Sequence, residues 1–231
     1  MTPAGDVAKR LLDIALALLL LVPALPLMAA LWLAIRLVDG PPALYAAERI
    51  GRHGRPFTLW KFRTMSAGEG PERGVSGGDK AHRVTRLGAR LRRWRLDELP
   101  QIFNVLGGSM SFVGPRPPVR QYVERFPEIY IPILEARPGI TGLATAVLHA
   151  REDRLLAATR SAEETDAVYI RRCIPRKARL DRLYLAHAGL LLDLYILYLT
   201  AARLVPLPFG RARRLRSQAR EVYALASRSA A

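Results

Sequence analysis

Cysteine and histidine are scarce in this sequence of 231 residues, and their scarcity limits the sites that it can form. The single cysteine, Cys173, excludes a disulfide bond within the chain and a metal cluster held by cysteines. The four histidines are scattered, without a spacing typical of metal ligands. One free thiol in a chain of this length is consistent with a reducing compartment.

Acidic residues are also few, with 20 Asp and Glu against 36 Lys and Arg, so the formal net charge is +16. Such an excess predicts an anionic partner: phospholipid, a phosphorylated substrate or nucleic acid. The basic stretches match no fold motif for nucleic-acid binding, and aromatic side chains are not interleaved among them as stacking platforms. We therefore expect anionic phospholipid or phosphate, and no nucleic acid, as the partner.

The N-terminal apolar stretch, residues 11–35, is not followed by a small-residue cleavage site, so we expect it to stay attached to the protein. It carries one charge, Asp13, and is long enough to cross the hydrocarbon core of a bilayer. Pro23 and Pro26 stand in its middle, where each removes a helical hydrogen bond and favours a kink. Two shapes stay open: a kinked single span, or a re-entrant hairpin bent near Pro23. The positive-inside tendency disfavours the span, because both flanks are basic.

An acidic pair, Asp97 and Glu98, follows directly after a segment crowded with arginines. In residues 83–95, apolar side chains recur at helical spacing beside a stripe of arginines, which predicts a basic amphipathic helix. Such a helix could lie on an anionic membrane, bind phosphates or simply present a solvated face. Its position directly before the two carboxylates favours phosphate binding.

Four further cations are candidates for binding a phosphorylated substrate. Residues 57–65 predict a strand whose alternation places Lys61 and Arg63 on one face. Arg116 lies in a rigid proline-rich turn that could grip a phosphate or pyrophosphate, and Arg137 begins a second tight turn. Each of these two turns could equally be structural, with an exposed arginine.

Several motifs, which appear in order over about residues 9 to 200, resemble the bacterial sugar transferase family. These enzymes are the monotopic polyprenyl-phosphate phosphoglycosyltransferases, and the chain is similar to their minimal catalytic form. The motifs are residues 9–13, 48–51, 61–65, 96–101, 104–106, 110–111, 113–117, 137–142 and 180–181, with Asp193. Their number and order make chance similarity improbable.

The resemblance implies transfer of a sugar 1-phosphate from a nucleotide diphosphosugar, usually a UDP-sugar, to polyprenyl (undecaprenyl) phosphate, with release of UMP. It makes Asp97 the nucleophile of a covalent phosphosugar intermediate and Glu98 the ligand of a magnesium ion (Mg²⁺). It also implies a monotopic enzyme on the cytoplasmic face of the bacterial inner membrane. A re-entrant anchor is part of that arrangement, so the resemblance favours the hairpin over the span.

The physical chemistry of the residues agrees with this assignment. A carboxylate can attack phosphorus only if a divalent cation and basic side chains offset the repulsion of an anionic pyrophosphate. Magnesium prefers oxygen ligands and keeps waters, so one protein carboxylate suffices. On a continuous helix Arg93 precedes Asp97 by one turn, whereas the family pattern gives the phosphate-binding position to Arg92. A break near Leu96 would reconcile the two, and we rank Arg92 before Arg93.

The chain departs from the family pattern at three positions. It has Ala47 and Thr145 where many members carry glutamine, and Val22 where the usual residue is serine. None of these changes removes the acidic pair. The first two keep open an alternative function, a membrane-tethered basic binding or scaffold protein for acidic lipid or nucleic acid, without catalysis. A homo-oligomer also stays open.

Together, the residues and the resemblance predict an α+β fold in three parts. Residues 1–40 form a membrane re-entrant helical hairpin anchor. Residues 41–205 form a small, mostly helical cytoplasmic catalytic domain with short strands and interfacial amphipathic helices. Its last segment, residues 183–205, is apolar but interrupted by charges, which suits an interfacial or core helix. Residues 206–231 form a basic tail, which anionic lipid would attract.

Overall fold

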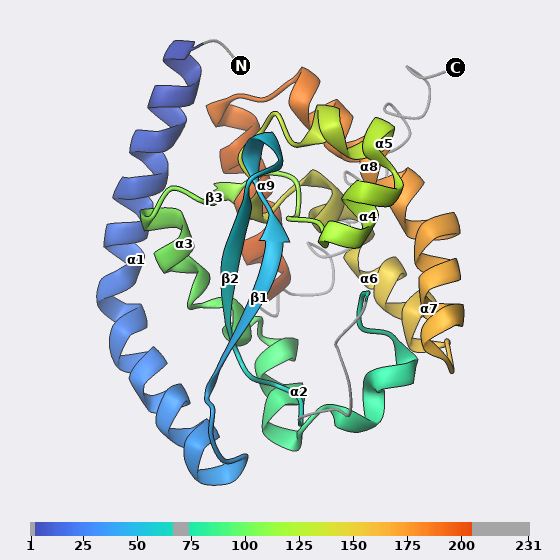
Figure 1. Ribbon diagram of the computed structural model, residues 1–231. Helices are drawn as coiled ribbons and strands as arrows, with labels where there is room; N and C mark the ends of the chain where they lie inside the picture. Colours follow the sequence, from blue (N-terminus) through green and yellow to red (C-terminus); the bar gives the residue numbers. More distant parts are fainter. Residues whose placement is uncertain (1–2, 67–73, 205–231) are drawn as a thin grey trace.

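The computed structural model describes residues 3–66 and 74–204 and shows an α+β fold (Figure 1). Helices predominate in this part of the chain, and its strands form two small sheets of two strands each. The mixed, mostly helical class predicted from the sequence is therefore confirmed. The predicted basic tail, residues 206–231, lies outside the described residues, and the boundaries at residues 40 and 205 stay predictions.

Helix α1, Pro3–Val38, runs as an arc along one side of the molecule (Figure 1). It continues through Pro23 and Pro26, and the lost hydrogen bonds at the two prolines account for curvature in this region. Only 17% of its most apolar window is buried against the protein. Leu19, Val22 and Leu37 are among the side chains exposed by 70% or more. Among the described helices, α1 is the one with the length and apolar character to cross a membrane.

Polar side chains near the N-terminus of α1 hold it to the rest of the protein. Buried Lys9 donates to Asp193 at 2.5 Å. The Oδ1 atom of Asp13, also buried, accepts hydrogen bonds from the Ser111 hydroxyl and the Phe112 amide, both at 3.0 Å. Asp13, the one charge within the apolar stretch, and Lys9 just before it are thus attachment points, which explains why they are tolerated.

The C-terminal end of α1 is attached to the same body of the protein. Asp39, directly after the helix, accepts a hydrogen bond from the Thr85 hydroxyl at 2.8 Å. Nearby, Arg63 donates to the carbonyl oxygens of Asp39 and Pro41 at 2.7 and 2.9 Å, and to that of Gly40. Both ends of α1 therefore contact one folded unit.

Strands β1, Leu44–Ile50, and β2, Pro56–Phe62, form an antiparallel hairpin in which Leu44 faces Phe62. The turn between them needs left-handed backbone at His53 (φ 59°) and Gly54 (φ 75°). The predicted strand over residues 57–65 is confirmed only as far as Phe62. Because β2 ends there, the alternation that was expected to align Arg63 with Lys61 does not continue.

The basic helix is shorter than the sequence pattern predicts. Helix α2, Arg86–Arg93, begins after Thr85, whose hydroxyl oxygen accepts a hydrogen bond from the Gly88 amide at 2.8 Å. Arg95 then takes a left-handed conformation (φ 55°) and turns the chain into a 3₁₀ turn, Leu96–Glu98. The predicted break near Leu96 is therefore present, one residue earlier.

Beyond this turn, helix α3, Gln101–Leu106, ends at Gly107 and Gly108, the second of which has a positive φ of 81°. Strand β3, Ser111–Val113, pairs in parallel with β4, Gly139–Thr141. Arg10 of α1 donates to the carbonyl oxygens of Val105 and Leu106 at 2.6 and 2.9 Å, so it caps the end of α3.

The remaining helices complete the fold, with α7 at the edge of the molecule opposite α1 and α9 behind the hairpin (Figure 1). They are α4 (Arg120–Arg125), α5 (Pro127–Ile133), α6 (Leu143–Ala157), α7 (Ala162–Val168), α8 (Ile174–Ala186) and α9 (Leu190–Leu204), with a π-helical turn at Tyr169–Cys173. In α9, Ile196 is buried whereas Leu191 is 86% exposed, so one face of this apolar helix packs on the core and the other does not. This matches the predicted interfacial or core helix better than a membrane span.

Candidate functional site

The acidic pair lies in the 3₁₀ turn between α2 and α3, and both side chains are buried, with Asp97 8% and Glu98 7% exposed. The left-handed Arg95 redirects the chain, so the pair does not continue the face of α2. Pro100 follows two residues later and stands directly before α3. A short turn between two helices therefore fixes both carboxylates against strand β2.

Glu98 is bound by three cations from three segments of the chain. Its Oε1 atom accepts from Lys61 of β2 at 3.2 Å and from Arg116 at 2.7 Å, and its Oε2 atom accepts from Arg95 at 2.5 Å. Burial alone would raise the pKa of Glu98, but Arg116, Lys61 and Arg95 hold it well below the usual range. Glu98 is therefore ionised at neutral pH.

Asp97 has a different environment, although it is the next residue. Its carboxylate makes no hydrogen bond or ion pair with any residue that the structure describes. Burial and the charge of Glu98 raise its pKa, and Lys61, Arg92 and Arg116 offset part of that rise. Asp97 is thus a buried carboxylate with its oxygens uncommitted, beside several positive charges.

The arginine-rich helix contributes Arg92 to this group. The Nε atom of Arg92 donates to the Thr64 hydroxyl at 2.8 Å, and its charge acts on Asp97. Arg93 is exposed and forms no hydrogen bond or ion pair with the described residues. Of the two arginines, Arg92 is therefore the one whose charge acts on the acidic pair, and its ranking before Arg93 as a phosphate ligand stays a prediction.

Two predicted substrate contacts lie elsewhere. Arg63 follows the end of β2, and its guanidinium binds the carbonyl oxygens of residues 39–41 at the junction of α1 and β1. Arg137 is placed near the N-terminal part of α1, where burial lowers its pKa and Asp6 partly offsets this. Its buried Nη1 atom has no hydrogen-bond partner among the described residues. The structure brings neither arginine to the acidic pair.

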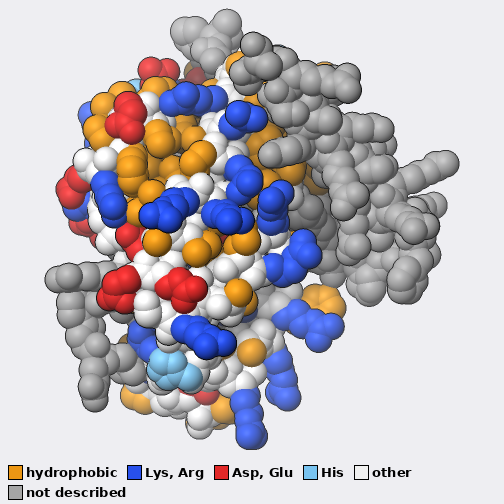
Figure 2. Space-filling model, turned by 90° about the vertical axis from the view of Figure 1, so that its right-hand side faces the viewer, with side chains coloured by type: hydrophobic (Ala, Val, Ile, Leu, Met, Phe, Trp, Pro, Cys, Tyr) orange, Lys and Arg blue, Asp and Glu red, His pale blue; other side chains and the backbone are white. Residues whose placement is uncertain are grey.

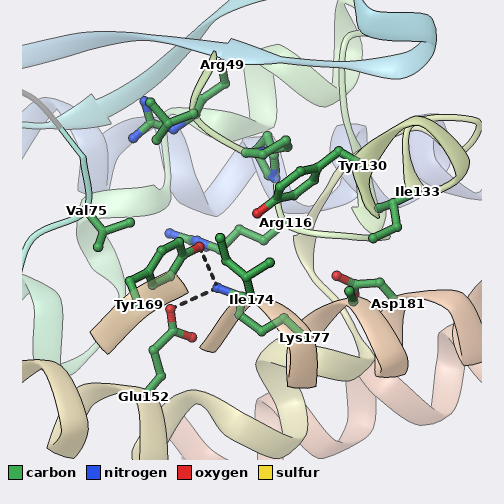
Figure 3. Close-up of a pocket in the computed structure, with 14 residues that line it drawn as sticks. Arg49, Val75, Arg116, Tyr130, Ile133, Glu152, Tyr169, Ile174, Lys177 and Asp181 are labelled. Carbon is green, nitrogen blue, oxygen red and sulfur yellow. Dashed lines mark hydrogen bonds and ion pairs between the residues drawn. The ribbon is translucent and has the colours of Figure 1, made fainter. Parts of the chain in front are cut away.

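A cavity of about 100 Å³ adjoins the acidic pair on the side of α6 and α8, and Arg116 lines it (Figure 3). On one wall Lys177 donates to Glu152 at 2.9 Å and to the Tyr169 hydroxyl at 3.4 Å. Asp181 lies one helical turn beyond Lys177 on α8. Because Arg116 also binds Glu98, the cavity and the acidic pair share one wall residue.

Of the residues around this cavity, only Arg116 was predicted from the sequence to bind substrate, although Asp181 belongs to one of the motifs of the resemblance. Lys177 and Asp181 are four residues apart in the sequence that forms α8, a spacing that places them on one face of a helix and that could have been noticed. Glu152 comes from α6, and its pairing with Lys177 depends on how the two helices pack. Figure 2, which views the molecule from the side of these helices, shows many Lys and Arg side chains among apolar ones.

Comparison with known proteins bears on the identity of this site. The family model for bacterial sugar transferases matches residues 4–206. The chain belongs to this family. Its acidic pair and the cations around it lie within the matched residues, as does helix α1 apart from its first residue.

Three curated relatives show the range of this family. One from Caulobacter vibrioides, a UDP-glucose:undecaprenyl-phosphate glucose-1-phosphate transferase, is 46% identical over 61% of the chain and 54% of its own length. One from Xanthomonas campestris with the same name is 36% identical over 86% of the chain and 39% of its own length. The undecaprenyl-phosphate galactose phosphotransferase of Salmonella typhimurium is 40% identical over 58% of the chain and 31% of its own length. The chain thus matches less than two thirds of each relative, and the named sugars differ.

The departures from the family pattern fall at three different kinds of position in this sugar transferase. Ala47 is buried in β1 opposite Leu59, so its small side chain fits the packed hairpin. Thr145 is half-buried near the start of α6, and Val22 is 75% exposed on the arc of α1. None of the three contacts the acidic pair through a hydrogen bond.

Proposed function

We propose that the protein transfers a sugar 1-phosphate from a UDP-sugar to polyprenyl phosphate, with undecaprenyl phosphate as the acceptor. The observation that carries this proposal is the environment of Asp97: a buried carboxylate without a partner, beside a second carboxylate that neutralises the neighbouring cations. The names of the relatives, which specify UDP-glucose or galactose and undecaprenyl phosphate, support the same reaction class.

In this reaction an oxygen of Asp97 attacks the sugar-proximal phosphorus of the donor. The bond from that phosphorus to the bridging oxygen breaks, and the electron pair leaves with UMP. An oxygen of polyprenyl phosphate then attacks the same phosphorus and displaces the Asp97 carboxylate, which regenerates the enzyme. Lys61, Arg92 and Arg116 are placed to stabilise charge on the phosphoryl oxygens during both steps.

The donor set of the turn fits magnesium in its chemistry. Two adjacent carboxylates supply hard oxygens, and magnesium commonly uses one or two such ligands with phosphates and waters. Among the described residues, no group of three or more His, Cys, Asp or Glu side chains could coordinate a metal, so substrate phosphate and water would supply the other ligands of the ion. Glu98 would hold the ion by giving up one of its three contacts with cations. The contact with Lys61, at 3.2 Å, is the longest of the three. When bound, the ion would neutralise pyrophosphate charge.

The attachments of α1 support a re-entrant anchor on the cytoplasmic face of the inner membrane. A helix of 36 residues is about 54 Å long, more than the hydrocarbon core of about 30 Å. A straight span would put its two ends on opposite sides of the bilayer. Lys9 near one end and Asp39 beyond the other both bind the same folded unit, which favours ends on one side. No observation favours the alternative of a binding or scaffold protein without catalysis.

The deciding experiment measures UMP release by the full chain in nanodiscs with magnesium, undecaprenyl phosphate and a panel of UDP-sugars. We expect Asp97→Asn to lower turnover by about ten-thousandfold or more, because the amide is not a nucleophile. Asp153→Asn, which changes an exposed acid of α6, is the matched control and should retain the wild-type rate. A phosphosugar adduct on Asp97, trapped without acceptor and seen by mass spectrometry, would complete the assignment. Wild-type turnover by Asp97→Asn would refute it.

A further inference from the structure

The cavity beside Arg116 contains a buried carboxyl group whose position packing does not explain. Asp181 is 7% exposed and forms no hydrogen bond or ion pair with any residue that the structure describes. A buried polar group without a partner costs free energy that an apolar side chain of similar size would not. Figure 3 shows its carboxyl group on α8, directed toward the cavity that Arg116 and Tyr130 close from the other side.

From this arrangement we infer that Asp181, with the Lys177–Glu152 pair, forms the subsite that recognises hydroxyl groups of the donor's sugar. The inference rests on the proposed function, because it assigns a substrate part to the same site. Asp181 is a specificity-determining residue in this scheme, and Asp97 remains the nucleophile.

The location of the cavity selects the sugar among the parts of the donor. Arg116 contacts Glu98 of the acidic pair at 2.7 Å and also lines the cavity. The sugar is bonded directly to the phosphate that Asp97 attacks, so it must lie next to the acidic pair. A water needs roughly 10–15 Å³ of such space, so a cavity of about 100 Å³ holds several waters. That space suits one sugar ring and is too small for a whole nucleotide.

The chemistry of the walls suits a polyhydroxyl ligand. Lys177 has three N–H donors, and the two contacts given for it, to Glu152 and the Tyr169 hydroxyl, leave one for a ligand. The contact of Glu152 to Lys177 uses its Oε1 atom, so its other oxygen can accept from a ligand. Burial raises the pKa of Asp181 to about 7, with Lys177 opposing the rise, so near neutral pH this carboxyl group can donate or accept. A sugar ring presents hydroxyl groups of both kinds.

A uracil ring is the competing occupant, since tyrosines also line the cavity. Its flat, mostly apolar faces would leave much of the charged wall without partners. The attacked phosphorus is also one phosphate further from the uridine than from the sugar. We therefore assign the cavity to the sugar and make the nucleotide an outcome of the test.

The test compares wild type, Asp181→Asn and Asp181→Leu in the UMP-release assay with the best UDP-hexose and its monodeoxy analogues. We expect wild type to discriminate against one analogue by about tenfold to a hundredfold in kcat/KM, and both variants to lose most of that discrimination. Because Asp181 has no partner to lose, both variants should fold, which thermal unfolding in the same nanodiscs checks. Asp153→Asn is the matched control and should keep the wild-type preference.

Inhibition by UMP separates the possible outcomes. If the cavity binds the sugar, the inhibition constant of UMP stays the same in all variants while donor discrimination changes. A parallel weakening of UMP binding would assign the cavity to the nucleotide and overturn the inference. Unchanged discrimination, with wild type turning over, would also overturn it and leave the proposed function standing. If wild type turned over none of the donors, both the proposed function and the assignment of the cavity would be refuted.

Discussion

Glu98 and Asp181 are buried to the same extent, 7% exposed each, yet their pKa values are shifted in opposite directions. Glu98 is bound by Lys61, Arg95 and Arg116, and its pKa lies well below the usual range. Asp181, which lines the same cavity as Arg116, makes no contact within ion-pair distance with any cation among the described residues, and burial raises its pKa to about 7. The number of cations in contact, and not the depth of burial, therefore decides the direction in which the pKa of each carboxyl group is shifted.

The largest expected effect comes from removing the charge of Glu98. Glu98→Gln leaves three cations packed around an uncharged side chain, and breaking a buried pair in this way typically costs about 3–5 kcal/mol of the free energy of unfolding. We also expect loss of turnover, since magnesium would lose its carboxylate ligand. Chemical denaturation in detergent and the UMP-release assay measure the two effects. A variant as stable as wild type would mean that the three contacts contribute little.

The pH dependence of the free energy of unfolding tests whether the pKa of Asp181 is raised, in contrast to the lowered pKa of Glu98. Its pKa is raised in the folded protein, so the stability that it contributes is complete below the unfolded-state pKa of about 3.9 and is lost as pH rises to about 7. Across that window the loss is about 1.4 kcal/mol for each pH unit. Asp181→Asn should therefore flatten the fall in stability between about pH 4 and 7, relative to wild type. If wild type and Asp181→Asn lost stability equally between about pH 4 and 7, Asp181 would have an ordinary pKa and be ionised in the folded protein.

A smaller effect on stability is expected for Arg63, a cation that contacts neither the acidic pair nor the cavity. Arg63→Ala removes three contacts to carbonyl oxygens, so we expect a loss of roughly 1–3 kcal/mol in the free energy of unfolding. The KM for the UDP-sugar should stay within about twofold, because Arg63 does not reach the acidic pair. Arg116→Ala is the matched comparison and should raise this KM by about tenfold or more. A large rise in KM for Arg63→Ala would place it at the substrate after all.

The acidic pair shows how far sequence reasoning reaches. Asp97 and Glu98 are adjacent in the chain and follow a basic segment, so their importance was visible without a fold. The break before them was also predictable, because Pro100 and the family pattern both conflict with a continuous helix. What the sequence could not show is that Glu98 collects the cations while Asp97 keeps its oxygens uncommitted.

The two misplaced arginines show where pattern reasoning ends. Alternation along a strand predicts that Arg63 shares a face with Lys61, but alternation holds only while the strand lasts, and β2 stops at Phe62. The tight turn expected over residues 137–142 is instead occupied largely by strand β4, Gly139–Thr141, and neither a turn nor a strand dictates where the Arg137 side chain goes. Its position beside Asp6 depends on how α1 packs.

By itself, the sequence determined the family, the mixed helical class, the long apolar helix and the acidic pair, because each is written in residues that are close together in the chain. Only the tertiary structure decided which cations surround Glu98, that both ends of α1 bind one folded unit, and that Arg116, Glu152, Lys177 and Asp181 share a cavity. These features join residues from segments far apart in the chain. Electrostatic interactions and burial depend on distances in space, and spacing along the chain does not specify those distances.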